Sequence, residues 1–244
     1  MTRLYSHLSV ALIAALLMAA PHVHTRSIER SVAITFDDLP GAGPGTVVPD
    51  AAGLEALSRK LLIAIRQHSV PAIGFVNEAG LRLDGPFVDD RARRVGILRS
   101  WLEAGLELGN HTYSHRDLNT TPLDAYEADV IRGEAVTRIL LRQTGRTPRY
   151  FRHPLLHVGP DLVTRRAFEA FLAERGYIVA PVTVDSDEFV YAAAYAAALR
   201  RGDSAGARRV ADDYLRYMED TFAYFGRCHG APSAARSRRS WLAN

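Results

Sequence analysis

The segment SVAITFDDLPG, residues 31–41, decides the fold class, because in it an apolar run leads directly into acidic residues. The run from Ser31 to Phe36 is rich in β-branched and apolar residues, which is typical of a buried strand. Asp37 and Asp38 then precede a Leu-Pro-Gly sequence, which favours a turn. The segment therefore predicts a buried strand that ends in a polar loop.

Strands and helices alternate along the rest of the chain. Short β-branched or apolar runs predict strands at 71–76, 149–151 and 177–184, and residues 105–109 lead toward the end of a further strand. Helical spacing predicts helices over 53–67, 89–104, 122–143 (with Pro122 in the first turn), 161–175, 188–201 and 205–225. This order indicates an α/β protein whose sheet is largely parallel and closed or nearly closed. In such folds, active sites gather where strands end.

The N-terminal residues have the pattern of a secretory signal. Arg3 precedes an apolar run from Leu8 to Ala20, and Pro21 follows it. The run is shorter than the ~20 apolar residues that cross a bilayer. We expect a signal within residues 1–24 whose cleavage leaves no stable membrane span and a secreted or periplasmic protein. An uncleaved anchor or a buried helix is the alternative.

Composition bounds the remaining organisation. The 244 residues, 48% of them hydrophobic, suffice for one sizeable domain, which we expect over 31–226. Cys228 is the only cysteine, so no internal disulfide can form. Basic residues concentrate near both ends, and an irregular basic tail is expected over 227–244. The body between the ends is mildly acidic, which argues against a nucleic-acid partner.

Four clusters of polar residues each come directly after a predicted strand. The clusters are Asp37-Asp38, His111-Thr-Tyr-Ser-His115, Arg152-His-Pro and, after the last clear strand, residues 185–189. Two histidines four positions apart on a helix or tight loop present both rings on one face. With one carboxylate they form a three-ligand metal site that leaves positions open for water and substrate. Side chains of adjacent strand residues point to different sides, so one aspartate is expected to bind metal while the other faces a water.

Each cluster also has an ordinary structural interpretation. An Asp-Asp pair before Leu-Pro-Gly is often only part of a turn. Two histidines with helical spacing occur by coincidence on surfaces, and Arg152 could pair with any buried acid. The joint occurrence of the clusters in chain order, each at a strand end, favours a functional site.

These motifs resemble those of the polysaccharide deacetylase family, the NodB-homology domain of carbohydrate esterase family four. Residues 35–38 (TFDD) are similar to the first motif, residues 111–115 (HTYSH) to the second, and residues 152–154 (RHP) to the third. Residues 185–189 (DSDEF) are a looser version of the fourth. The resemblance covers about residues 31–189 and implies a distorted, incomplete (β/α) barrel with fewer than eight units.

The resemblance also implies roles for individual residues. Asp37 would be the general base, and Asp38, His111 and His115 would hold a divalent metal, commonly zinc. Arg152 would orient Asp37, and Asp185 would in turn hold Arg152. The implied activity is removal of acetyl groups from N-acetylated sugars of a polysaccharide or oligosaccharide. A metal-binding relative that binds glycan without turnover, or an O-acetyl esterase on acetylated xylan, are the alternatives.

The sequence departs from the family in its last part. The fifth motif of the family is a Leu-x-His segment on a late strand, whose histidine protonates the leaving group. No such segment follows Phe225. We expect a truncated or altered C-terminus, for example through a reading-frame change; the alternative is that His229 or His157 replaces the acid.

Overall fold

Five parallel strands form the centre of the protein. The computed structural model describes residues 32–41, 50–81 and 88–228. The strands are β1 (Ile34–Leu39), β2 (Ala72–Val76), β3 (Glu107–Asn110), β4 (Tyr150–Phe151) and β5 (Ile178–Val179). They lie side by side in sequence order, each parallel to the next. Strand order without reversal is the order of a (β/α) barrel rather than of a doubly wound sheet. The structure thus confirms the predicted α/β fold, with five strands as the incomplete barrel.

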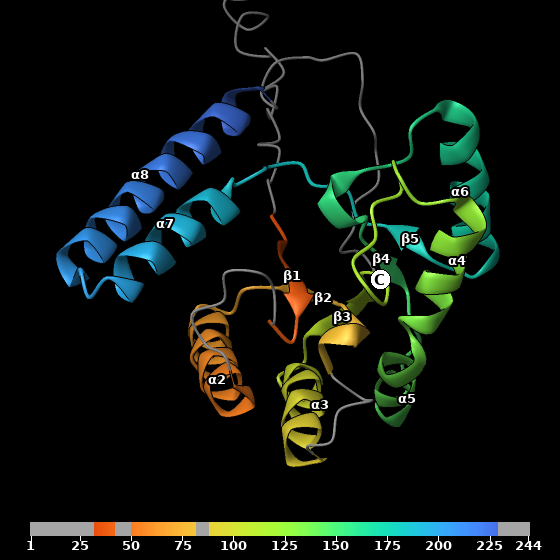
Figure 1. The fold of residues 1–244 in the computed structure, drawn as a ribbon, viewed down its shortest axis with the longest axis horizontal. Coiled ribbons are helices and arrows are strands. Elements are labelled where there is room, and N and C mark those ends of the chain that lie inside the picture. Colours follow the sequence, from red (N-terminus) through yellow and green to blue (C-terminus); the bar gives the residue numbers. More distant parts are fainter. Residues whose placement is uncertain (1–31, 42–49, 82–87, 229–244) are drawn as a thin grey trace, which may run out of the picture. The chain divides into compact units, whose positions relative to one another are not determined.

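The helices between the strands pack beside the sheet, whereas the last two helices follow the final strand and pack against each other (Figure 1). They are α2 (Ala51–Gln67), α3 (Val88–Glu103), α4 (Leu123–Arg132), α5 (Ala135–Gln143), α6 (Leu162–Glu174), α7 (Glu188–Arg200) and α8 (Ser204–Cys228), with short 3-10 turns η1 (Glu78–Leu81) and η2 (Pro154–Leu156). Aspartates cap α2 and α6: the carboxylates of Asp50 and Asp161 accept backbone N–H groups at 2.7 and 2.8 Å. No described helix is long and apolar enough to cross a membrane.

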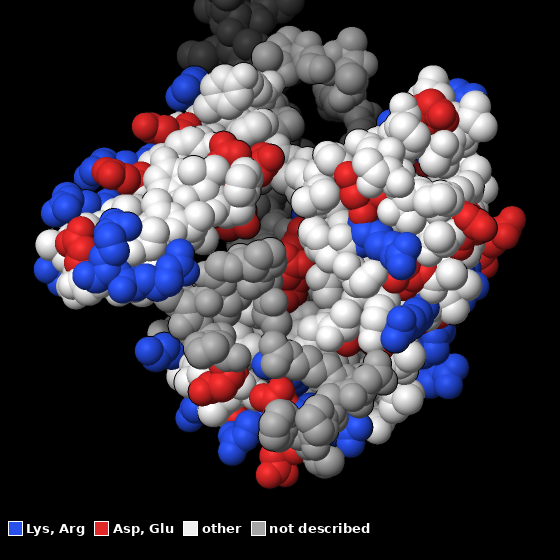
Figure 2. Space-filling view, in the orientation of Figure 1, with Lys and Arg blue, Asp and Glu red and all other residues white. Residues whose placement is uncertain are grey.

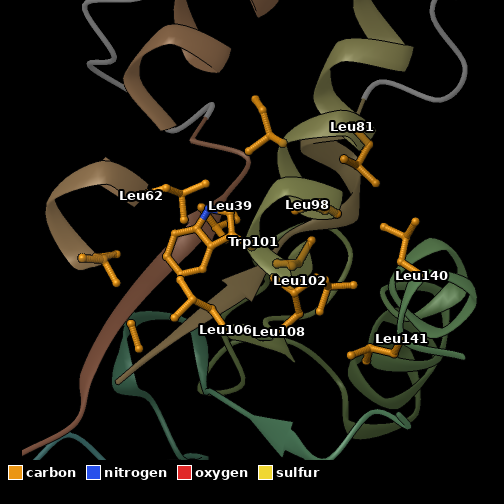
Figure 3. Close-up of a cluster of buried hydrophobic side chains, with 14 of the residues drawn as sticks. Leu39, Leu62, Leu81, Leu98, Trp101, Leu102, Leu106, Leu108, Leu140 and Leu141 are labelled. Atoms are coloured by element: carbon orange, nitrogen blue, oxygen red, sulfur yellow. The ribbon is translucent and has the colours of Figure 1, made fainter. Parts of the chain in front are cut away.

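The main core lies between the first three strands and the helices that cover them (Figure 3). Trp101 is fully buried there. Its ring meets Phe36 edge-on, with the ring centroids 5.5 Å apart. A Cβ at Gly74 of β2 would lie 2.1 Å from Leu39 Cδ1 and 3.2 Å from the Trp101 ring. Only glycine therefore allows both large side chains to close over this strand.

The expected helix over 122–143 is in fact two helices, α4 and α5. Pro122 is the N-cap of α4 rather than a first-turn residue. The break falls at Gly133 and Glu134, where the backbone of Thr112 and Tyr113 approaches. A new helix can begin immediately after the break, since the Glu78 carboxylate accepts backbone N–H groups from the first turn of α5. The interruption therefore makes room for the loop that carries the two histidines.

Two further boundaries differ from the sequence prediction. The strand expected over 177–184 is only β5, because the ladder ends at Ala180, whose N–H donates to Phe151 at 2.8 Å, and Pro181 has no N–H to continue it. Helix α8 runs to Cys228, two residues into the expected tail. The rest of that tail and the expected signal region lie outside the described residues.

Candidate metal centre

A bulge in β1 positions Asp37 and Asp38. Phe36 pairs with Gly74 and Leu39 with Val76, so Asp37 and Asp38 together face one residue of β2. Asp38 takes a left-handed conformation, with φ of 64°. The pair was expected to follow the strand and to point to different sides. Both expectations are wrong, because the bulge places the pair within the strand and turns both carboxylates toward the end of β3.

The two histidines lie on a tight loop directly after β3. Thr112 and His115 both have positive φ, 64° and 56°, which side chains other than glycine rarely adopt. Local hydrogen bonds hold this conformation: Asn110 Oδ1 accepts the Thr112 N–H at 2.7 Å, and Thr112 Oγ1 accepts the His115 N–H at 3.0 Å. The imidazole rings stand edge to face, with centroids 5.0 Å apart. The loop therefore converges the two rings, as the spacing of the histidines predicted.

The Nδ1 atom of His111 is held by a backbone carbonyl, which fixes the orientation of the ring. His111 Nδ1 lies 2.8 Å from the backbone carbonyl of Arg152. Since a carbonyl only accepts, this contact assigns the proton to Nδ1 and leaves the Nε2 lone pair free. Burial lowers the pKa of His111 to about 4, so the ring is neutral near neutral pH. A neutral imidazole oriented by its second nitrogen is the form that binds metal.

One oxygen of Asp38 completes a three-ligand cluster. Asp38 Oδ1 lies 3.7 Å from His111 Nε2 and 3.6 Å from His115 Nε2. It is buried and has no hydrogen-bond partner, which is unfavourable for a carboxylate oxygen unless a cation satisfies it. Ligand atoms around a tetrahedral zinc ion with bonds near 2.1 Å stand about 3.4 Å apart. The spacing, the donor set and the orphaned oxygen therefore fit a divalent cation. Within the described residues, Asp38, His111 and His115 are the set of three side chains whose ligand atoms lie close enough together to hold one metal ion.

Asp37 lies beside this cluster and is paired with Arg152. Its Oδ2 is 3.5 Å from Arg152 Nη1 and 4.0 Å from His111 Nε2. Burial raises the pKa of Asp37, while the positive charge of Arg152 opposes that rise. A third of the Asp37 side chain is still exposed, so water can reach it. The arrangement places a second, partly exposed carboxylate next to the three candidate ligands, as predicted.

Arg152 is held by residues that sequence analysis did not single out for this role. Its guanidinium donates to Thr35 Oγ1 at 3.1 Å and lies 4.8 Å from the centre of the Phe75 ring. The expected ion pair with Asp185 is absent from the described structure: Asp185 is exposed, and its carboxylate accepts only the Asp187 N–H, at 3.4 Å. The prediction is wrong here because β5 ends six residues before Asp185.

The remaining histidines near the third motif differ in environment. His153 is buried between the rings of Phe151 and Phe168, and burial lowers its pKa to about 4. His157 is half exposed, and its Nδ1 lies 2.8 Å from Asp117 Oδ1. Asp117 follows the candidate ligand His115 by two residues, so their Cα atoms are at most ~7.6 Å apart. His229 lies outside the described residues.

These motifs and this geometry agree with a comparison against protein families. A family model described as polysaccharide deacetylase matches residues 24–167, more than half of the chain. The chain belongs to the polysaccharide deacetylase family. The match includes Asp37, Asp38, both loop histidines and Arg152, and it ends before Asp185.

One curated relative of this deacetylase family member is a peptidoglycan-N-acetylglucosamine deacetylase from Bacillus cereus. The two sequences are 30% identical over 126 residues, which is 52% of this chain and 36% of the relative. The chain thus spans about a third of the length of the curated relative that it matches.

Solved structures of three family members also resemble the chain. The family 4 carbohydrate esterase of Streptomyces lividans, in complex with acetate, matches with a TM-score of 0.45 and 23% identity over 65% of this chain and 66% of that one. The chitin deacetylase of Colletotrichum lindemuthianum gives a TM-score of 0.47 and 22% identity, over 80% and 81% of the two chains. A CE4 family pseudoenzyme from Bacillus anthracis gives 0.48 and 13%, over 79% and 62%.

Proposed function

We propose that the protein is a metal-dependent hydrolase that removes acetyl groups from the N-acetylated sugars of a polysaccharide or oligosaccharide. The observation that carries this proposal is the orphaned Asp38 oxygen facing two imidazole nitrogens, with the partly exposed carboxylate of Asp37 beside it. Membership of the polysaccharide deacetylase family supports the substrate class. Because the family also includes pseudoenzymes, turnover itself has to be measured.

The proposed metal ligands are Asp38, His111 and His115. Two imidazoles and one carboxylate favour zinc. When bound, such a cation would polarise the acetyl carbonyl and acidify a water molecule. Asp37 would accept the proton of the attacking water, since it is the carboxylate beside the cluster that remains solvent-accessible. Arg152 would hold Asp37 in place and keep it ionised.

We propose His157 as the group that protonates the leaving amine. Its Nδ1 lies 2.8 Å from the Asp117 carboxylate, which orients the ring, and its side chain is open to solvent. Replacing it by glutamine should lower acetate release from an N-acetylated oligosaccharide by ~10²-fold. Hydrolysis of an aryl acetate should change little, because a phenolate leaves without protonation. The matched control is His68→Gln on the exposed end of α2. An equal loss on both substrates would contradict this role.

Secretion is part of the same proposal, because acetylated structural polysaccharides lie outside the cytoplasm. The apolar run between Leu8 and Ala20 supports it. Expression of the full chain with a reporter enzyme that is active only after export would test it. A reporter that stays inactive would contradict secretion without bearing on the chemistry.

Acetate release tests the central proposal. Zinc-loaded protein should release acetate from N-acetylated chitooligosaccharides, and Asp37→Asn should reduce the rate by about 10²- to 10⁴-fold with metal content unchanged. Release from acetylated xylan alone would indicate an O-acetyl esterase instead. Metal and glycan binding without release would indicate a non-catalytic relative, which the solvent exposure of Asp185 favours as the second candidate. Failure to bind metal would overturn all three.

A further inference from the structure

One buried carboxylate outside the ligand set contacts the histidine loop at several points. Asp129 of α4 is 7% exposed. Its Oδ2 accepts the backbone N–H groups of Tyr113 and Ser114 at 3.1 and 2.9 Å. Its Oδ1 accepts the Ser114 hydroxyl at 2.8 Å and lies 3.6 Å from Arg116 Nε. A single side chain thus binds two consecutive peptide groups between the two histidines.

The loop needs such an anchor because its backbone is strained at both ends. Thr112 and His115, which bracket the two anchored residues, both have positive φ. Such conformations in non-glycine residues each cost about 1–3 kcal/mol and persist only where the surroundings impose them. Asp129 is well placed to impose them, since hydrogen bonds from backbone N–H groups to a charged carboxylate are stronger than neutral ones.

The same turn of α4 contacts the loop through other groups. The Asp129 carbonyl also accepts the Tyr113 N–H, at 3.0 Å. The Arg132 guanidinium lies 3.6 Å from the centre of the Tyr113 ring. A Cβ on Gly133 would lie 2.5 Å from the Tyr113 nitrogen. The end of α4 therefore forms a cradle around the loop, and Asp129 is its acidic member.

We infer that Asp129 is a positioning residue for the metal centre: it sets the affinity for a divalent cation by holding the two imidazoles in their converged arrangement. This inference rests on the proposed ligand set. Asp129 does not touch a ligand side chain, so its effect passes through the backbone between residues 112 and 115. Groups outside the ligand shell that fix ligand orientation typically change metal affinity by ~10–100-fold.

Metal titration of the purified full-length protein tests the inference. Co²⁺ binding is followed by its visible absorption and Zn²⁺ binding by competition with a chelating dye. We expect Asp129→Asn to weaken both affinities by ~10-fold or more, because an amide offers one acceptor oxygen where the carboxylate offers two. Ser114→Ala removes only the hydroxyl contact and keeps both backbone contacts, so its effect should be smaller. The Co²⁺ spectrum of Asp129→Asn should also change, since the two rings are less well fixed.

Glu78→Gln provides the matched control. Glu78 is also a buried carboxylate that accepts two consecutive backbone N–H groups, but those belong to Val136 and Thr137 of α5. The Glu78→Gln variant should lower the melting temperature of the metal-free protein while leaving the Co²⁺ and Zn²⁺ affinities near those of the wild type.

Three results would overturn the inference: wild-type affinity in Asp129→Asn, an equal loss of affinity in Glu78→Gln, or an effect of Ser114→Ala as large as that of Asp129→Asn. If the wild-type protein itself binds no metal, the proposed function fails instead, so the two failures are distinguishable.

Discussion

The loop after β3 and the segment after β5 each carry a polar motif but occupy very different environments. In the first, His111 and Thr112 are almost fully buried, and Asn110, Asp129 and Arg152 supply hydrogen bonds to the loop. In the second, residues 185–189 are largely exposed, and the Phe189 side chain is 66% accessible. The difference shows that a motif becomes a site only where the fold supplies partners that fix its side chains.

The charge distribution leads to the same view of the molecule. Figure 2 shows Lys and Arg interspersed with Asp and Glu over the described part of one face. The polar groups that support a function are those at the ends of β1, β3 and β4.

The largest effect is expected where a helix contacts the loop after β3. Gly133→Ala would place a Cβ 2.5 Å from backbone atoms of Thr112 and Tyr113, which no rotamer change can relieve. We expect a loss of about 3 kcal/mol in the free energy of unfolding, together with weaker metal binding. Chemical denaturation and zinc titration measure the two effects.

Gly96→Ala on α3 is the control for that substitution. A Cβ there meets no atom within 4 Å, so the same change should stabilise the helix by about 0.5–1 kcal/mol. If Gly133→Ala changed the free energy of unfolding and the zinc affinity only slightly, the loop after β3 would tolerate displacement. The contrast with the exposed segment after β5 would then fail.

An intermediate effect is expected from acidification, through His153. Its pKa is about 4 in the folded protein and about 6.5 in the unfolded chain, so the unfolded state takes up the proton first. Its contribution to stability is complete above about pH 6.5 and is lost as the pH falls toward about 4. The total loss is roughly 2–3 kcal/mol.

Unfolding curves of His153→Phe and wild type, measured between about pH 7 and pH 4 in the presence of a chelator, isolate this contribution. The free energy of unfolding of the variant should fall less steeply over that range, because phenylalanine fits the aromatic cluster and does not titrate. His111 is present in both proteins, so its own response cancels in the difference. Identical slopes would show that His153 is solvated in the folded state.

The smallest effect is expected from Asp185→Asn. Since Asp185 is exposed and makes no ion pair with Arg152 in the described structure, acetate release should stay within about twofold and stability within about 0.5 kcal/mol. Steady-state assays beside Asp37→Asn measure the contrast. A loss at Asp185 that matched the loss at Asp37 would restore the role implied by the family motif and show that the segment after β5 moves toward the site.

The sequence by itself determined the features that depend on neighbouring residues. Hydrophobic periodicity identified α2, α3 and α6 within one or two residues. The second motif predicted converging imidazoles, because four residues on a tight loop fix their own geometry. Family membership also followed from short motifs in chain order.

Tertiary structure alone decided the features that depend on distant segments. The motifs implied that Arg152 orients Asp37, but only the fold brings the two together across 115 positions of the chain, and only the bulge in β1 turns both aspartates toward the same site. The role of Asp129 had one trace in the sequence, a charged residue between the buried Tyr126 and Val130 of a helix. The residues that Asp129 contacts depend on how the chain packs, and so does the lack of an ion pair between Asp185 and Arg152 in the described structure. Contacts between distant residues produce no periodic pattern in the local sequence, so the sequence alone did not predict them.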